Sequence, residues 1–212
     1  MGEVLAVCTV HALLPDRGIG VTAIDKRAAD RPLRVRALGL HGDVQADRQH
    51  HGGEDQAVYA YAQEDADWFA ADLGRDVPPG LFGENLRTSG VQVTDAVIGE
   101  RWRVGAKAVL EATSPRQPCG TFERRMRVRG WAQRFAAHGA PGAYFRVVRT
   151  GDLQAGDEVE VVDRPAHGVT IGRWFSHRAP DDAQALLDAE AAGAVRLQPD
   201  LRRHVEAALA RG

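Results

Sequence analysis

The sequence predicts a mainly β protein: a β-barrel covered by a few helices and followed by a small all-helical domain. Two observations support this fold class. Up to about residue 164, many short segments rich in β-branched residues are separated by glycine turns. After Pro165 the strand pattern ends and apolar residues recur at helical spacing. We therefore expect a barrel domain over residues 1–164 and a helical domain over residues 165–212.

The expected strands are identified by runs or alternations of apolar residues. They lie at residues 3–10, 31–40, 56–62, 91–93, 100–105, 108–113, 143–149 and 157–163. In the second of these, Val35 and Ala37 alternate with arginines, as in a half-buried strand. Residues 18–23, GIGVTA, fit a loose dinucleotide-binding pattern. We reject nucleotide binding there, because Pro32 interrupts the segment before a crossover helix could form.

The expected helices are bounded by proline and glycine. Residues 63–74 have acidic residues in the first turn and end at Gly74, and residues 122–139 have a helical pattern broken by Gly130. In the tail, residues 180–193 and 199–212 each begin with proline and end with glycine. One or two helices are therefore expected to cover the barrel, and at least two to form the tail.

Composition excludes several classes of partner. The chain has 27 Lys and Arg residues against 29 Asp and Glu residues. This near-neutral balance gives no reason to expect binding to polymeric nucleic acid or to a membrane surface. The N-terminus lacks a basic region with a cleavage site, and no segment approaches about 18 uninterrupted apolar residues. The two cysteines, Cys8 and Cys119, form no CxxC motif. A reduced, cytoplasmic protein is the simplest interpretation.

Cys119 lies in the segment PRQPCGTF, between prolines and a run of arginines. Pro115 and Pro118 restrict the backbone, so we expect the cysteine on a stiff loop. Positive charge from Arg116 and the arginines that follow favours the thiolate, the form that ligates metals or attacks electrophiles. A buried, inert cysteine is the alternative. The stiff, positively charged setting favours a functional thiol.

The densest polar cluster is GLHGDVQADRQHHGGEDQAVYAY, at residues 39–61. Its paired glycines, Gly52 and Gly53, together with Arg48 and His51, suit an anion cradle in which backbone N–H groups approach a phosphate. Its carboxylates and imidazoles could instead bind a divalent metal. A solvated turn between two strands is the third interpretation. Residue spacing alone does not choose among the three.

The segment FGENL contains Glu84 and Asn85, the only asparagine in the chain. An asparagine side chain offers both a donor and an acceptor, so it can recognise the edge of a heterocycle or hold a loop in place. The preceding residues 77–83, VPPGLFG, are rigid loop material that could form the wall of a pocket.

Five segments together resemble the MOSC domain family, named for the C-terminal part of molybdenum cofactor sulfurases. They are HGDVQADRQHHGGEDQAVYAY, PPGLFGENL, VIGERWRVG, PRQPC and GAYFRVV. Their order is most similar to the stand-alone bacterial YiiM type, whose chains end in a small three-helix domain. The resemblance covers about residues 3–163 for the barrel and residues 165–212 for the tail.

The resemblance implies a barrel that binds molybdenum cofactor, independently of pyridoxal phosphate, with Cys119 supplying a thiolate to the metal. It also implies reduction of N-hydroxylated compounds, such as hydroxylaminopurines, to amines. Motif position and charge assign cofactor binding to Arg48, His51, Gly52, Gly53, Glu84, Asn85, Arg116 and Cys119. Cys119, His51 and Glu84 are the expected catalytic residues, and which of His51 and Glu84 passes a proton stays open.

Two cysteines are too few for an iron–sulfur cluster of four thiolates, so we expect a separate flavin or iron–sulfur reductase as electron donor. The tail could serve docking or homodimerisation, or only packing. Two other functions stay open. One is a carrier that binds the cofactor without turnover. The other is a divalent-metal hydrolase that uses His41, Asp43, His50 and His51.

Overall fold

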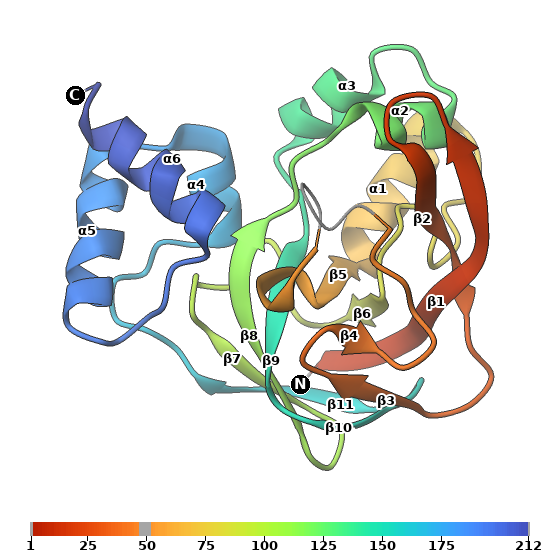
Figure 1. The fold of residues 1–212 in the computed structure, drawn as a ribbon, viewed down its shortest axis with the longest axis horizontal. Coiled ribbons are helices and arrows are strands. Elements are labelled where there is room, and N and C mark those ends of the chain that lie inside the picture. The colour runs from red at the N-terminus through yellow and green to blue at the C-terminus, as the bar shows by residue number, and fades with distance from the viewer. Residues whose placement is uncertain (1, 47–51, 212) are drawn as a thin grey trace.

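The computed structural model describes residues 2–46 and 52–211. Its barrel strands are Gly2–Asp16 (β1), Val58–Ala62 (β5), Leu86–Ser89 (β6), Arg101–Val104 (β7), Ala108–Pro115 (β8), Ala143–Arg149 (β9) and Glu158–Asp163 (β11). Within the described residues these seven strands follow the order β11, β7, β8, β9, β5, β6, β1, and pairing of β1 with β11 closes the barrel (Figure 1). The pairings are antiparallel apart from β5 with β6. The predicted fold class is confirmed.

A long hairpin and a small separate sheet accompany the barrel. Gly20–Ala28 (β2) pairs with β1 as a long antiparallel hairpin, so residues 18–23 form a turn and a strand. Leu33–Arg36 (β3), Gly39–Leu40 (β4) and Gly151–Leu153 (β10) form a small separate sheet. The single strand expected at residues 31–40 is therefore divided into β3 and β4 by a turn.

The strand expected at residues 91–93 is wrong, because these residues lie in a turn region and the strand is β6. Leu86, Arg87 and Thr88 are all buried, since β6 lies between β1 and β5 in the sheet. A strand buried on both faces shows no alternation of apolar and polar residues. The sequence of β6 therefore lacks the alternating pattern by which strands were predicted. Val93 is apolar because its side chain enters the core from a turn.

Three helices cover one side of the barrel (Figure 1): Gln63–Leu73 (α1), Gly120–Met126 (α2) and Trp131–His138 (α3). The expected helix boundaries at glycine are confirmed, because Gly74 and Gly130 both adopt left-handed backbone angles. The helices enclose an aromatic cluster. It includes Phe69, Phe82, Phe122, Trp131 and Phe135, together with Tyr59 and Tyr61 of β5.

Three helices follow the barrel: Ile171–His177 (α4), Pro180–Ala191 (α5) and Pro199–Leu209 (α6). The two predicted tail helices are present, and α4 is additional to the helices read from the sequence pattern. Trp174, Leu186 and Val205 of the tail belong to the same hydrophobic cluster as Trp102 and Phe145 of the barrel. The domain boundary near residue 165 stays a prediction. Throughout residues 2–46 and 52–211, no helix is long and apolar enough to cross a membrane.

The β1–β2 hairpin is held against α2 by ion pairs. Arg124 binds Asp16 through two hydrogen bonds, of 2.9 Å from Nε and 2.5 Å from Nη2, and Arg125 donates to Asp25 over 2.7 Å. Asp16 also accepts hydrogen bonds from the backbone N–H groups of Gly18 and Ile19 at the hairpin turn. The arginines after Cys119 therefore have structural partners that fix the hairpin relative to α2.

We expect the Asp16–Arg124 pair to make stability depend on acid pH. The hydrogen bonds from Arg124 lower the pKa of Asp16 from 3.8 to about 2. Because the folded-state pKa is lowered, the stabilisation is complete above pH 3.8 and is lost as the pH falls towards 2. The difference between the urea unfolding midpoints of the parent and Asp16→Asn should be largest above pH 3.8 and should become smaller below it. Asp152→Asn, in an exposed pair with Arg34, is the control. A gap for Asp16→Asn that does not change with pH would contradict the assignment.

Candidate functional site

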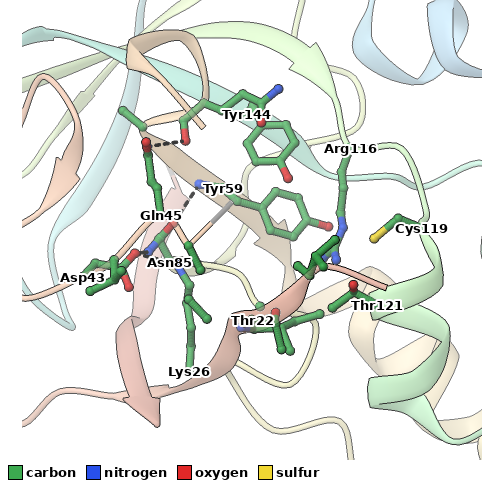
Figure 2. Close-up of a pocket in the computed structure, with 18 of the residues that line it drawn as sticks. Thr22, Lys26, Asp43, Gln45, Tyr59, Asn85, Arg116, Cys119, Thr121 and Tyr144 are labelled. Atoms are coloured by element: carbon green, nitrogen blue, oxygen red, sulfur yellow. Dashed lines mark hydrogen bonds and ion pairs between the residues drawn. The ribbon is translucent and has the colours of Figure 1, made fainter. Parts of the chain in front are cut away.

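A pocket opens where the hairpin, the covering helices and the barrel meet (Figure 2). One wall is β2, with Thr22 and Lys26, and another is the loop from β8 to α2, with Arg116 and Cys119. Its lining also includes residues 43–46, Tyr59 of β5, Asn85 before β6 and Tyr144 of β9. Segments from across the whole barrel domain therefore contribute to this one pocket.

Cys119 is placed by the two prolines of its segment. β8 ends at Pro115, the chain runs through Pro118 without regular structure, and Cys119 is the extended residue directly before α2, with φ −128° and ψ 169°. The expected loop position is confirmed. Cys119 is half-buried and lines the pocket, with its sulfur directed towards Arg116 (Figure 2).

Arg116 places a fixed positive charge beside this thiol. Its side chain is buried, and its guanidinium carbon lies 4.0 Å from the ring centre of Phe122 and 5.0 Å from that of Tyr59. Burial alone would lower the pKa of Arg116, but the ionisable groups of Tyr59, Tyr144 and Cys119 raise it above its usual value. The guanidinium therefore stays charged at the pocket wall.

Asn85 holds the floor of the pocket together. Its side-chain oxygen accepts a hydrogen bond from the backbone N–H of Tyr59 (3.1 Å), and its amide nitrogen donates to the Cys8 carbonyl (3.2 Å) and to Asp43 (2.7 Å). Asp43 also forms an ion pair of 2.5 Å with Lys26. Of the two roles considered for Asn85, the geometry favours holding a loop in place, because both amide protons already have acceptors.

Glu84 lies below the pocket, in the protein interior. It is fully buried and forms an ion pair with the equally buried Arg87. Its two oxygens also accept hydrogen bonds from the backbone N–H groups of Gly80 (2.8 Å) and Phe82 (3.0 Å). Gly83 and Asn85 line the pocket, whereas Glu84 is absent from its lining. The geometry therefore gives Glu84 a structural role, and its catalytic role stays an untested prediction.

Gln45 organises the polar turn. Its amide oxygen accepts from the N–H of Gly53 (2.9 Å), and its amide nitrogen donates to the carbonyls of Gly53 (3.2 Å) and Leu38 (3.1 Å). Gly53 has φ 84° and ψ −179°, a conformation essentially limited to glycine. Gly52 and Gly53 border the turn but do not line the pocket. The predicted cofactor residues Arg48 and His51 lie outside the described residues.

The metal-hydrolase alternative receives no support from the described residues. No group of three His, Cys, Asp or Glu side chains within them could hold a metal ion. His41 is exposed, and Asp43 is paired with the charge of Lys26 and accepts a hydrogen bond from Asn85. The other two residues of that alternative, His50 and His51, lie outside the described part of the chain.

Sequence reasoning missed several lining residues. Thr22 lies in the segment 18–23, considered only for nucleotide binding, and Lys26 lies further along β2. Tyr59 and Tyr144 show only the pattern of ordinary strand residues. Lys26 had one usable signal, since it is one of only two lysines in the chain. The tyrosines had none, because their direction depends on how the strands pair.

The fold and the site first define a class: closed β-barrels that carry a pocket with a thiol beside a buried arginine. Comparison then identifies the family. The sequence model of the MOSC domain family matches residues 47–160, so the chain belongs to the MOSC domain family.

Relatives agree with this assignment. The chain is 32% identical over 177 residues to Protein YiiM of Escherichia coli, covering 79% of this chain and 78% of that protein. It is also 32% identical over 150 residues to YflK of Bacillus subtilis, covering 71% of this chain and 67% of the relative. A protein named Reductase from Gibberella moniliformis is 32% identical over 152 residues, 68% of this chain, but the match spans only 26% of that protein.

Solved structures show the same fold. The crystal structure of YiiM from Geobacillus stearothermophilus superposes with a TM-score of 0.78 at 23% identity, covering 99% of this chain and all of the other. YiiM from Escherichia coli gives a TM-score of 0.76 at 24% identity and covers 100% of this chain and 94% of the other. At these identities the superpositions support the fold alone.

Proposed function

We propose that the protein is a molybdenum-cofactor-dependent oxidoreductase that reduces N-hydroxylated compounds to amines. One observation carries the proposal: in a MOSC domain, the pocket brings the thiol of Cys119 next to the permanent charge of Arg116. The relative named Reductase lends support to redox chemistry. The reaction is R–NH–OH + 2 e⁻ + 2 H⁺ → R–NH₂ + H₂O.

The residues of the pocket fit molybdenum cofactor by their chemistry. A thiolate is the soft ligand that suits a metal already bound by dithiolene sulfurs, and Cys119 is the described cysteine on the pocket wall. Arg116 and Lys26 provide positive charge for an anionic cofactor, although Lys26 shares its charge with Asp43. Bound there, the cofactor would supply the two-electron centre at which the N–O bond is cleaved.

The chain's own groups would position the reactants and hold protons. Tyr144 lines the pocket, and burial raises the pKa of its phenol, so this group keeps its proton at neutral pH. The hydroxyl of Tyr59 already donates to the Pro141 carbonyl (2.9 Å). We therefore assign to Tyr144 a hydrogen bond donated to the substrate. Electrons are expected from a separate flavin or iron–sulfur reductase.

The test uses protein purified from a host that makes molybdenum cofactor, with chemically reduced viologen as electron donor. With 6-hydroxylaminopurine as substrate, we expect adenine to form at one molecule per two electrons, followed by chromatography and viologen oxidation. Protein purified without cofactor is the control and should form no adenine. Cofactor-loaded protein that forms no adenine, and whose reduced state is not reoxidised by the substrate in a single turnover, would overturn the reductase and support the carrier.

A further inference from the structure

A second cavity lies at the junction of the barrel and the helical tail. Its volume is about 260 Å³, and its walls include Ser114 of β8, Trp174 of α4 and His204 of α6. This cavity shares Gln56, Gln117 and Tyr144 with the pocket of Cys119. The two cavities therefore lie on either side of a common wall. We call the second one the junction cavity.

Contacts between tail and barrel hold the junction cavity open in a defined shape. Arg178, at the end of α4, donates to the side-chain oxygen of Gln117 (3.2 Å). Arg196 forms an ion pair of 2.8 Å with Asp55, the neighbour of Gln56 in the chain. Both contacts link the tail to segments that border the common wall. The cavity is thus preformed, as small-molecule sites usually are.

The junction cavity carries no net charge among the described residues. Its two charged side chains, Asp200 and Arg203, form an ion pair with each other at the rim. Partial burial, aided by the nearby Arg178, lowers the pKa of His204, so this imidazole is neutral at neutral pH. A cavity of this kind suits a neutral polar ligand and offers no unpaired cation to a phosphate group.

The common wall contains a hydrogen-bond acceptor that needs a partner. The side-chain oxygen of Gln56 is buried and has no hydrogen-bond partner within the described structure. A buried acceptor without a donor is costly, and a turn of the Gln56 side chain towards the cavity, where a ligand can donate an N–H or O–H, would remove that cost. The aromatic rings of Tyr144 and Trp174 complete a cavity lined by both polar and aromatic groups.

We propose that the junction cavity is the substrate site of the same reaction, and that it selects a neutral N-hydroxylated heterocycle, as free base, over its nucleotide. The ring would lie between barrel and tail, with its N–OH group donating to Gln56 and directed towards the pocket of Cys119. The size of the cavity agrees with this, since about 260 Å³ is below the usual range for drug-sized ligands of about 300–1,000 Å³. This inference rests on the proposed function and adds the location and class of the substrate.

The test is a variant that alters the wall of the junction cavity without contacting the other pocket. His204 lies at the surface of α6, with part of its ring against the junction cavity, and it lines only that cavity. His204→Phe should therefore fold, narrow the cavity slightly and remove the polar ring nitrogens from its wall. Ala207→Phe is the matched control, because Ala207 is an exposed residue of the same helix outside both cavities. Binding of 6-hydroxylaminopurine and of adenine is measured by calorimetry, and the KM and the molybdenum content are measured on cofactor-loaded protein.

We expect His204→Phe to weaken base binding and raise the KM at least tenfold with unchanged molybdenum, whereas Ala207→Phe should match the parent. The parent should also prefer the free base over its ribonucleoside triphosphate by at least tenfold in kcat/KM. Equal binding of the base by His204→Phe and the parent, or preference for the triphosphate, would overturn the junction-cavity inference and leave the reductase intact. If the parent reduces no N-hydroxylated compound, the reductase fails, and calorimetry still tests the cavity.

Discussion

Replacing Cys119 with alanine is expected to reduce molybdenum per chain by at least about tenfold. Loss of a residue that only supports a metal ligand already lowers metal affinity by about 10- to 100-fold. The reason is chemical, because among the residues that line the pocket only Cys119 offers a thiolate. The measurement is elemental mass spectrometry of protein purified from a host that makes the cofactor, expressed as metal per chain. The same variant should lose reduction of 6-hydroxylaminopurine.

Cys8→Ala is the matched control, since it removes the other thiol of the chain. Cys8 is fully buried in β1, and burial raises the pKa of its thiol to about 12, so it is inert at neutral pH. We expect normal molybdenum in this variant and a loss of unfolding free energy of about 1 kcal/mol. Full molybdenum in Cys119→Ala, or an equal loss in both variants, would contradict ligation by Cys119.

Replacing Arg87 with alanine is expected to lower the free energy of unfolding by about 3–5 kcal/mol, because it leaves the buried Glu84 charge unpaired. Both side chains are fully buried, and Arg87 also donates to the carbonyl of Val77 (3.1 Å). The result would be measured by urea unfolding. A loss of this size is a large part of the total stability of an ordinary domain, about 5–15 kcal/mol.

Two comparison variants separate structure from catalysis at this buried pair. Glu160→Gln alters a pair with Arg103 that is exposed on both sides, and should cost less than about 1 kcal/mol. Glu84→Gln keeps one side-chain oxygen, which can accept from the N–H group of Gly80 or of Phe82 but not from both, and the folded fraction should retain its pH–rate profile. A folded Glu84→Gln variant that binds substrate but shows an altered pH–rate profile would restore Glu84 as a proton donor. A small effect of Arg87→Ala would show that the pair is not sealed from water.

Local sequence signals were sufficient for those features of the fold that depend on single residue types or on short patterns. Gly74 and Gly130 mark helix boundaries because the left-handed backbone is inexpensive only for glycine. Pro115 and Pro118 keep Cys119 out of regular structure, since proline restricts the backbone wherever it occurs. The mainly β fold class and two of the tail helices, α5 and α6, also followed from such patterns.

Sequence by itself therefore determined the fold class, the helix boundaries at glycine and the position of Cys119 in an irregular loop, because each depends on residues close together in the chain. Only the tertiary structure decided which face each strand presents and which distant segments meet. It buried Glu84 with Arg87 and placed Lys26 and Tyr144 in the pocket. It also formed the junction cavity from β8, α4 and α6. These outcomes depend on strand pairing and helix packing between residues far apart in the chain, which local periodicity does not encode.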